Sequence, residues 1–265
     1  MVSNKIKEIV EKRRKSLEID KNLINSLNDI NLNKNRTPLS EKIKNNLDIS
    51  IISEIKPSSP TLGEIRNDID VKKTAIEMQD AGVVGLSILT EPNYFNGSYD
   101  NLRLAVENTN LPCLMKDFVI DEIQFKIARQ IGATNILLIN SIVDLPKFYS
   151  LSQNYDLEPL IEIHDAEEIK DIRGLLEVGF KPKLLGVNNR NLKTLEIDLN
   201  TSRQIIPKLK EEFGEKLQVV SESGINSKDE ITFVQPSGAD AFLIGSSIMK
   251  SNNIKEKILE LRGIK

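Results

Sequence analysis

The sequence is poor in the residues that most metal sites and many catalytic centres use. Its 265 residues include one cysteine, Cys113, and one histidine, His164. A single cysteine excludes an intrachain disulfide and a cysteine-rich metal site, and a single histidine excludes a histidine-based metal cluster. Cys113 lies in the apolar segment Leu111–Met115, so we interpret it as a small buried hydrophobe rather than a reactive thiol. Any catalysis must therefore use lysine, carboxylate, asparagine, serine and backbone amide groups.

The sequence also lacks an excess of charge of one sign and any long apolar run. Its 36 Lys and Arg residues and 39 Asp and Glu residues give a formal net charge of −3, which argues against a polycationic face for nucleic acid. No apolar run approaches the ~18 residues that a membrane helix needs, and the charged N-terminus does not resemble a signal peptide. We therefore expect a cytoplasmic protein that binds neither nucleic acid nor a membrane.

What the sequence does contain is a regular alternation of short apolar runs and amphipathic segments. The apolar runs are mostly rich in β-branched residues, which is typical of strands buried on both faces. Eight such runs follow one another: Ile49–Ile55, Gly85–Leu89, Cys113–Met115, Asn135–Ile139, Leu160–Ile163, Leu184–Val187, Gln218–Val220 and Ala241–Ile244. Helix patterns lie between them, for example over Val71–Ala81, Ile120–Gln130, Ala166–Val178, Thr201–Phe213 and Lys228–Val234.

This alternation predicts parallel strands joined by right-handed helical crossovers. An open doubly wound sheet usually has fewer strands and often a glycine-rich phosphate loop after the first one. The sequence contains neither a GxGxxG motif nor a P-loop. Eight βα units therefore favour a (β/α)8 TIM barrel.

The first 48 residues differ from this repeating part and predict a helical extension. Helical spacing relates Ile6, Ile9, Val10, Arg13 and Leu17. The stretch from Asn22 to Asn46 forms either a second short helix or an ordered arm, because Leu23, Leu27, Ile30 and Leu32 need burial. We expect one (β/α)8 barrel domain over residues 1–265, with residues 1–48 as an N-terminal helical extension.

Polar side chains follow the predicted strands, at the end where such barrels carry their active sites. Glu54 and Lys56 are two residues apart, so both leave the first strand on one face. They either meet at the barrel mouth or form a surface ion pair beyond the strand end. Lys116 and Glu162 follow two other strands in the same way. Lysine and glutamate packed together in a pocket with little water have shifted pKa values and can serve as acid and base.

The loops after the last two strands carry glycines. Gly224 precedes a helix, and Gly245-Ser246 opens the last helix. Backbone amides beside such glycines form a phosphate cradle, and its presence on both loops favours phosphate binding over the alternative that the glycines only serve tight turns. Phe95 and Phe118 either stack on a substrate ring or close the top of the core. We interpret His164 as a scaffold residue.

Seven segments, in order, resemble the indole-3-glycerol phosphate synthase family of tryptophan biosynthesis. They are Ile52–Pro60, Leu89–Ser98, Pro112–Phe118, Leu160–His164, Leu185–Leu192, Ser221–Ile225 and Leu243–Met249. The segment Ile9–Arg14 also resembles that family's leading extension, so the resemblance covers essentially the whole chain. One departure is Thr61-Leu62-Gly63, where a Ser-Lys-Gly-like run is common in the family.

The resemblance implies a carboxy-lyase that converts 1-(2-carboxyphenylamino)-1-deoxyribulose 5-phosphate to indole-3-glycerol phosphate, with loss of CO₂ and water. It implies no metal and no organic cofactor. The matching catalytic residues are Lys116 as general acid, Glu162 as base, Lys56 as second lysine, and Glu54, Asn188 and Glu222 as supporting groups. The matching substrate-binding residues are Ser59 and Arg190 at the anthranilate carboxylate, Phe95, Phe118 and Leu192 around the ring, and Ser223 as a polar contact. The matching phosphate-binding residues are Gly224, Gly245 and Ser246.

Two other functions compete with this one. An isomerase barrel acting on a phosphoribosyl amine would share the phosphate cradle but would not need two lysines at strand ends. A non-catalytic binding barrel would tolerate loss of the acid and base residues, all of which are present here. We expect a small phosphorylated substrate and a monomer or weak homo-oligomer; association with other tryptophan-pathway enzymes is open.

Overall fold

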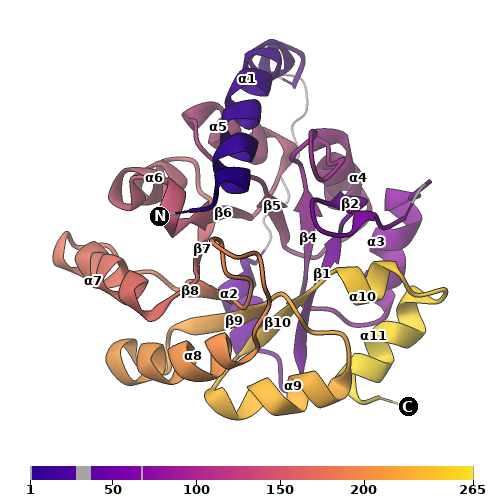
Figure 1. The fold of residues 1–265 in the computed structure, drawn as a ribbon. Helices are drawn as coiled ribbons and strands as arrows, with labels where there is room; N and C mark the ends of the chain where they lie inside the picture. Colours follow the sequence, from indigo (N-terminus) through magenta and orange to yellow (C-terminus); the bar gives the residue numbers. More distant parts are fainter. Residues whose placement is uncertain (1, 28–36, 67, 265) are drawn as a thin grey trace.

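Eight parallel strands form the centre of the molecule in a computed structural model that describes residues 2–27, 37–66 and 68–264 (Figure 1). The strands are β1 (Ser50–Ile55), β4 (Gly85–Leu89), β5 (Cys113–Lys116), β6 (Asn135–Ile139), β7 (Glu158–Ile163), β8 (Leu184–Asn188), β9 (Gln218–Glu222) and β10 (Ala241–Ile244). They close in the order β1-β10-β9-β8-β7-β6-β5-β4. Because β1 pairs with both β4 and β10, the strands form a closed barrel, and the predicted (β/α)8 fold is confirmed.

The apolar runs predicted the strands to within two residues; β1 and β7 differ at their first residues, and three other strands differ at their polar carboxyl ends. β5, β8 and β9 continue past the apolar run to Lys116, Asn188 and Glu222. The parallel pairing persists there, since Asn188 is in register with Glu222. A hydropathy pattern does not assign these residues to the strand, because their side chains are polar.

The helices form a ring around the strands (Figure 1). They are α3 (Val71–Asp80), α4 (Tyr99–Asn108), α5 (Glu122–Ile131), α6 (Leu145–Asn154), α7 (Ile169–Glu177), α8 (Asn200–Phe213), α9 (Lys228–Val234), α10 (Ser246–Met249) and α11 (Ile254–Arg262). Short 3₁₀ turns occupy η1 (Asn140–Ile142), η2 (Ala166–Glu168) and η3 (Gln235–Ser237), and a hairpin joins β2 (Ser58–Ser59) to β3 (Gly63–Glu64). Several helices begin where a side chain caps the first turn, as at Asp121 and Ser227, which both form capping boxes.

Two helix predictions need correction. Gly245-Ser246 opens the four-residue helix α10 and not the last helix, because α11 begins eight residues later at Ile254 with its own N-cap, Asn253. The helix predicted over Ala166–Val178 is split into η2 and α7, because Asp165 caps a 3₁₀ turn before the α-helix begins.

The extension closes the barrel interior at both ends. Helix α1 (Asn4–Leu27) brings Ile6 and Ile9 over one end, and α2 (Leu39–Lys44) brings Leu39 and Ile43 against the other, all within one core with the lumen side chains. The Leu39 N–H donates to Asn135 Oδ1 at the start of β6, 3.2 Å away. The predicted second short helix is therefore present. The residues Leu23, Leu27, Ile30 and Leu32 lie outside the part of the chain whose side chains are described.

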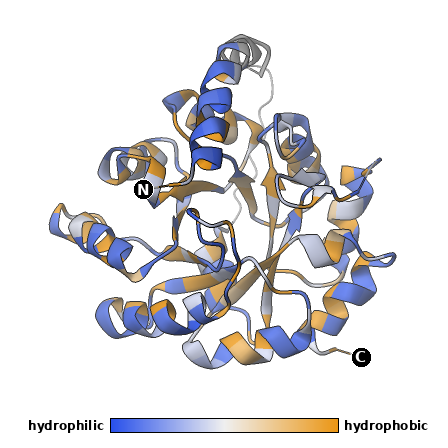
Figure 2. Ribbon diagram, in the orientation of Figure 1, coloured by the Kyte–Doolittle hydropathy of each residue, from blue (hydrophilic) through white to orange (hydrophobic). Residues whose placement is uncertain are grey.

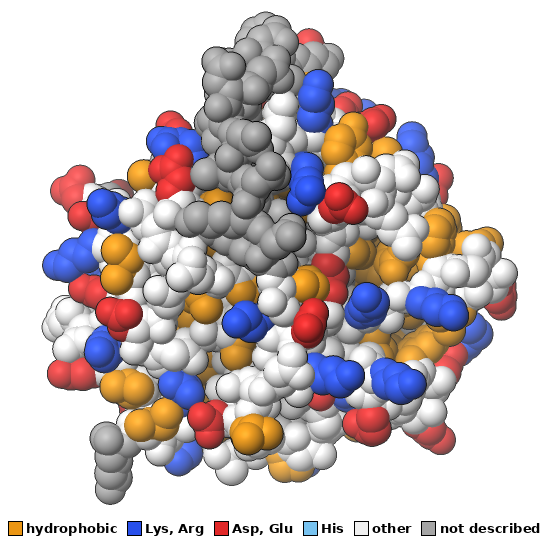
Figure 3. All heavy atoms as spheres, turned by 180° about the vertical axis from the view of Figure 1, so that it is seen from behind, with side chains coloured by type: hydrophobic (Ala, Val, Ile, Leu, Met, Phe, Trp, Pro, Cys, Tyr) orange, Lys and Arg blue, Asp and Glu red, His pale blue; other side chains and the backbone are white. Residues whose placement is uncertain are grey.

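A second, larger core fills the space between the strands and the helices. Figure 2 shows helices with one hydrophobic and one hydrophilic side around predominantly hydrophobic strands. Cys113 is completely buried in this core, as predicted. On the face shown in Figure 3, basic and acidic side chains are interspersed. Of the helices in residues 2–27, 37–66 and 68–264, none is long and apolar enough to cross a membrane.

Candidate active site

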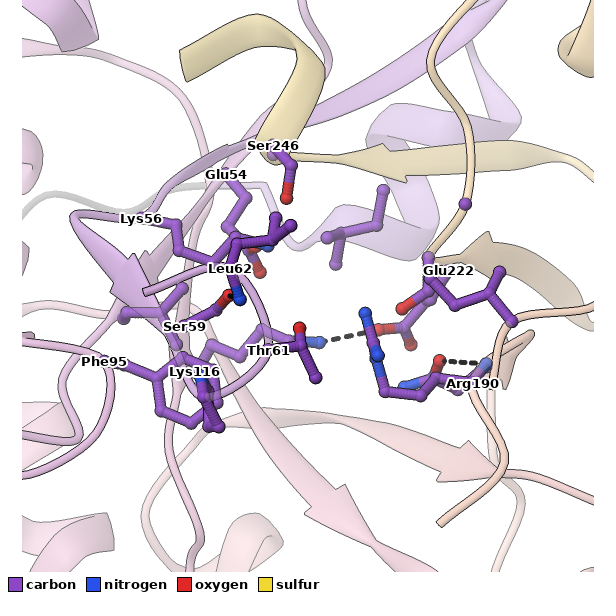
Figure 4. A pocket seen from close by; sticks show the side chains of 18 of the residues that line it. Glu54, Lys56, Ser59, Thr61, Leu62, Phe95, Lys116, Arg190, Glu222 and Ser246 are labelled. Carbon is purple, nitrogen blue, oxygen red and sulfur yellow. Dashed lines mark hydrogen bonds and ion pairs between the residues drawn. The ribbon is translucent and has the colours of Figure 1, made fainter. Parts of the chain in front are cut away.

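The residues assigned to a site from the sequence meet in one cavity at the carboxyl ends of the strands (Figure 4). The cavity has a volume of about 370 Å³. Every one of those residues lines it: Glu54, Lys56, Ser59, Phe95, Lys116, Phe118, Glu162, Asn188, Arg190, Leu192, Glu222, Ser223, Gly224, Gly245 and Ser246. The structure thus brings them together, while their individual roles remain predictions.

The alternation of side chains along each strand places the charged residues in the cavity. Each of four strands places an apolar side chain in the lumen, and the residue two positions later reaches the cavity. The pairs are Ile52 and Glu54, Leu114 and Lys116, Leu160 and Glu162, and Val220 and Glu222. The apolar layer below therefore supports a layer of lysine and glutamate above it.

Lys116 lies at the centre of this charged layer. Its Nζ is 2.6 Å from Glu222 Oε2 and 3.4 Å from Glu162 Oε2. Figure 4 shows Lys116 and Glu222 pointing toward each other across the cavity. Burial lowers the pKa of Lys116, but the charges of Glu222, Glu162 and Glu54 outweigh burial and raise it above its ordinary value. The ammonium form is therefore maintained although the side chain is only 16% exposed.

The pKa values of the two carboxyl groups beside Lys116 are shifted in opposite directions. Burial raises the pKa of Glu162, but the positive charges of Lys116 and His164 outweigh it and hold that pKa below its usual range. Burial raises the pKa of Glu222; Lys116 opposes this shift, and the negative charge of Glu162 adds to it. One carboxylate is thus kept ionised while its neighbour takes up a proton more readily, an arrangement suited to proton transfer.

Glu54 and Lys56 form a second pair, with Lys56 Nζ 2.7 Å from Glu54 Oε1. Both side chains are largely buried in the cavity wall, and the Ser87 hydroxyl donates to Glu54 Oε2 over 3.5 Å. Of the two arrangements open from the sequence, the structure therefore has the pair at the barrel mouth and not on the outer surface.

The loops after β9 and β10 carry Gly224 and Gly245, and both positions have a steric need for glycine. A Cβ on Gly245 would come within 2.5 Å of Glu54 Oε1. Gly224 has φ +85°, and a Cβ there would come within 2.6 Å of Ile197. The Ser247 hydroxyl donates to the Ile225 carbonyl over 3.2 Å and so ties the two loops together. Both loops present backbone to the cavity, as a phosphate cradle requires, but steric need alone also explains the glycines.

The apolar and cationic walls lie on the remaining sides. Phe95 and Phe118 have ring centroids 6.3 Å apart at 42°. Arg190 Nη1 donates to the Leu195 carbonyl over 2.8 Å, and the Arg190 N–H donates to Asn188 Oδ1 over 2.9 Å. Burial lowers the pKa of Arg190, and a guanidinium in that setting favours an anionic partner. Ser59 Oγ accepts from the Leu62 N–H over 3.1 Å, which fixes the β2–β3 hairpin beside the cavity.

The sequence did not identify every residue of the cavity. Helix α1 adds Lys5, Ile6 and Ile9, and β6 adds Leu137 and Ile139. The β6 residues could have been found from the same alternation that places Leu114 before Lys116. The α1 residues could not, because nothing local to the helix says which end of the barrel it covers.

His164 was interpreted as scaffold, yet its Nε2 lies 3.0 Å from Glu162 Oε1. The two-residue spacing from Glu162 was a signal for this proximity. Among the described residues, no group of three or more His, Cys, Asp or Glu side chains is arranged to hold a metal ion.

Comparison with known proteins assigns the chain to the family that the sequence resembles. The family model described as indole-3-glycerol phosphate synthase matches residues 4–261. A protein of that name from Methanocaldococcus jannaschii is 45% identical over 96% of this chain and 97% of its own length. Proteins of the same name from Nautilia profundicola and Oceanobacillus iheyensis are 41% and 38% identical, over 80% and 81% of this chain and 80% of each relative.

Among solved structures, thiamine phosphate pyrophosphorylase from Pyrococcus furiosus superimposes with a TM-score of 0.59. It is 16% identical, and the match covers 85% of this chain and 96% of that chain. At that identity the likeness concerns the fold alone.

Proposed function

Because the chain belongs to the indole-3-glycerol phosphate synthase family, we propose that its lysine–glutamate layer closes the indole ring of indole-3-glycerol phosphate. The reaction takes 1-(2-carboxyphenylamino)-1-deoxyribulose 5-phosphate, releases CO₂ and water, and belongs to tryptophan biosynthesis. The observation that carries the proposed site is Lys116 Nζ, 2.6 Å from Glu222 and 3.4 Å from Glu162 in a cavity floored by apolar side chains.

Ring closure begins when the aromatic carbon that bears the carboxylate attacks the ketose carbonyl. As the carbon–carbon bond forms, the carbonyl electron pair moves to oxygen, which must receive a proton. Lys116 is suited to supply it, because three carboxylates keep its ammonium charged at the cavity floor. The carbonyl oxygen then becomes a hydroxyl. The neighbouring carboxylates favour protonation of the neutral lysine, which restores the ammonium form.

Two eliminations complete the product. The bond to the carboxylate breaks and CO₂ leaves, and then the hydroxyl leaves as water while a base removes a proton from the ring system. Glu162 is suited to be that base, because its carboxylate is kept ionised. Lys56, 2.7 Å from Glu54, is suited to protonate the departing hydroxyl or to contact an anionic group of the substrate. Coupled groups of this kind titrate together.

Binding would orient the substrate between opposite walls. We assign the phosphate to the loops of Gly224, Gly245 and Ser246, whose backbone faces the cavity. The aromatic ring then lies toward Phe95, Phe118 and Leu192. Ser59 and Arg190 contact its carboxylate, and Asn188 and Ser223 supply polar contacts. Figure 4 has Ser246 and Phe95 on different sides of the charged layer, which supports this orientation.

The assembly and extent of the protein are also proposals. We propose one domain over residues 1–265, because α1 supplies Ile6 and Ile9 to the cavity wall and α2 supplies Leu39 to the lumen core. We further propose a monomer or weak homo-oligomer in the cytoplasm.

The test is indole fluorescence on mixing the purified protein with synthetic substrate, in the presence of a chelator. We expect turnover in the wild type and a loss of ~10²-fold or more in kcat for Lys116→Ala, since a proton donor is removed. Lys126→Ala, which changes an exposed lysine of α5, is the matched control and should keep full activity.

Other outcomes would point to other functions. Tight substrate binding without turnover in the wild type would favour a non-catalytic barrel. Conversion without release of CO₂ would favour an isomerase. Full activity in Lys116→Ala would remove Lys116 from the role of general acid.

A further inference from the structure

The single histidine of the chain lies directly behind the proposed base. His164 follows β7 by one residue, and its side chain is 6% exposed. Its Nε2 is 3.0 Å from Glu162 Oε1, and its Nδ1 is 3.7 Å from Glu168 Oε2. Glu168 Oε2 also accepts from the His164 backbone N–H, so the turn η2 holds that carboxylate against the histidine. The imidazole is thus enclosed between two carboxylates.

The two oxygens of Glu162 have different partners. Oε1 lies 3.0 Å from His164 Nε2, whereas Oε2 lies 3.4 Å from Nζ of Lys116, which lines the cavity. Neither imidazole nitrogen has a well-aligned hydrogen-bond partner among the described residues. The short contact to Glu162 therefore depends on charge more than on hydrogen-bond direction, and protonation of the imidazole strengthens it.

We propose that His164 is a positioning residue for Glu162: its imidazolium, enclosed between Glu162 and Glu168, fixes the carboxylate with Oε2 turned toward Lys116 and the substrate. The proposal rests on the proposed role of Glu162 as the base. It adds a residue that does not touch the substrate, since His164 is not among the residues that line the cavity in the described part of the chain. Any effect of His164 on the reaction would therefore come from the position and charge of Glu162.

The charges around the pair make a protonated imidazole stable at neutral pH. The charged groups facing His164 are Glu162 on β7 and Glu168 on η2; those facing Glu162 are His164, Lys116 on β5 and Glu222 on β9. Burial lowers the pKa of His164, but the two glutamates outweigh burial and raise it to about 9. The positive charge in turn favours the ionised form of Glu162, so its loss would make Glu162 easier to protonate.

The first test measures the histidine itself and does not depend on activity. Because the chain has one histidine, its imidazole NMR resonances are unique and can be titrated directly. We expect the wild-type imidazole to titrate near pH 9, and Glu162→Gln and Glu168→Gln each to lower that midpoint. The control is Glu167→Gln, an exposed neighbour of Glu168, which should leave the midpoint unchanged. A wild-type midpoint at or below the ordinary ~6.5, or one insensitive to Glu162→Gln, overturns the proposal.

The second test measures the effect on catalysis. His164→Asn keeps a polar side chain but removes the charge, so kcat should fall ~10-fold with KM changed less than ~2-fold, because only the base is misplaced. The acid limb of the kcat–pH profile should shift to higher pH, since Glu162 then becomes protonated more easily. A variant that unfolds at lower temperature but keeps the wild-type kcat and pH profile would show a purely structural histidine.

The two tests separate this proposal from the proposed function. If the wild type forms no indole-3-glycerol phosphate, the assigned reaction fails whatever the NMR result. If the wild type turns over and His164→Asn has an unchanged pH profile, the positioning role fails while the reaction stands.

Discussion

At the scale of single residues, glycines on or after neighbouring strands make room for the carboxylates of the site. Gly186 on β8 lies beside Glu222 of β9, and a Cβ on Gly186 would collide with Glu222 Oε1. Gly245, after β10, stands in the same relation to Glu54 of β1. Each of these buried glutamates can therefore keep its orientation only because the neighbouring position carries no side chain. These glycines serve the site by the space that they leave.

Gly186→Ala tests this interpretation. The methyl group must displace the Glu222 carboxylate, which is the flexible end of its side chain, so the fold should survive with roughly 1–3 kcal/mol less stability. Lys116 then loses its 2.6 Å partner, and we expect kcat to fall ~10-fold or more. The measurements are kcat by indole fluorescence and urea unfolding.

Gly174→Ala is the matched control for this substitution. Gly174 lies within α7, and a methyl group there would meet none of the described residues within 4 Å beyond its own helix backbone and chain neighbours. Alanine should therefore stabilise the helix by about 0.5–1 kcal/mol and leave kcat unchanged. Wild-type kcat in Gly186→Ala would show that Glu222 does not need its position.

At the scale of elements, one buried arginine fastens α1 to the active end of β5. Arg13 is fully buried, and its Nε and Nη2 donate to the two carboxylate oxygens of Asp117, each over 2.9 Å. Arg13 Nη2 also donates to the Tyr99 hydroxyl over 2.6 Å, and Arg13 Nη1 lies 2.9 Å from Asp20 Oδ2. Asp117 directly follows Lys116, so the extension is tied to the strand end that carries the proposed acid.

Removing this arginine should be costly. Arg13→Met leaves the buried Asp117 without its cationic partner, so we expect the free energy of unfolding to fall by about 3–5 kcal/mol. Arg13→Lys keeps the charge but not the two-pronged contact, and should recover only part of the loss. Urea unfolding measures both.

The control for the arginine is its neighbour on the same helix. Arg14 is well exposed and 3.8 Å from Glu11, so Arg14→Met should change stability by less than about 0.5 kcal/mol. Equal losses in the Arg13 and Arg14 variants would contradict the anchoring role of Arg13.

At the scale of the whole molecule, the two ends of the barrel have different tasks. The carboxyl end holds the charged layer and the cavity, and α1 covers part of it. The other end is closed by α2, where Leu39 is completely buried and its N–H is bonded to β6. Of the residues that the structure describes, those at the end closed by α2 thus contribute packing without lining the cavity, as this fold allows.

Leu39→Ala should therefore affect stability without affecting the reaction. Deleting a fully buried leucine costs about 2–5 kcal/mol, whereas kcat and KM should stay within ~2-fold because Leu39 lies at the end away from the cavity. Thermal or urea unfolding and steady-state kinetics give the two readouts. Leu47→Ala, at a fully exposed leucine close by in the chain, should be neutral in both. A Leu39→Ala enzyme with intact stability and reduced kcat would reverse the assignment of the two ends.

The sequence by itself determined the eight barrel strands, their order and the helical patterns between them. Buried strands are continuous apolar runs and helices repeat at 3.6 residues, so both signals are local, and the strands were predicted to within two residues. The same local signals found Glu54, Lys56, Lys116 and Glu162, because polar residues directly after apolar strands are conspicuous. The family resemblance added the expected roles of residues such as Asn188 and Arg190, which follow the sixth predicted strand.

The tertiary structure alone decided which of these residues meet. Barrel closure brings β1 against β10, and only then do Glu222 and Lys116, 106 positions apart, come within 2.6 Å. Packing of α1 against the barrel likewise joins Arg13 to Asp117, 104 positions away. Ion pairing, burial and the resulting pKa shifts depend on distance through space, and sequence spacing fixes that distance only within one strand or helix turn.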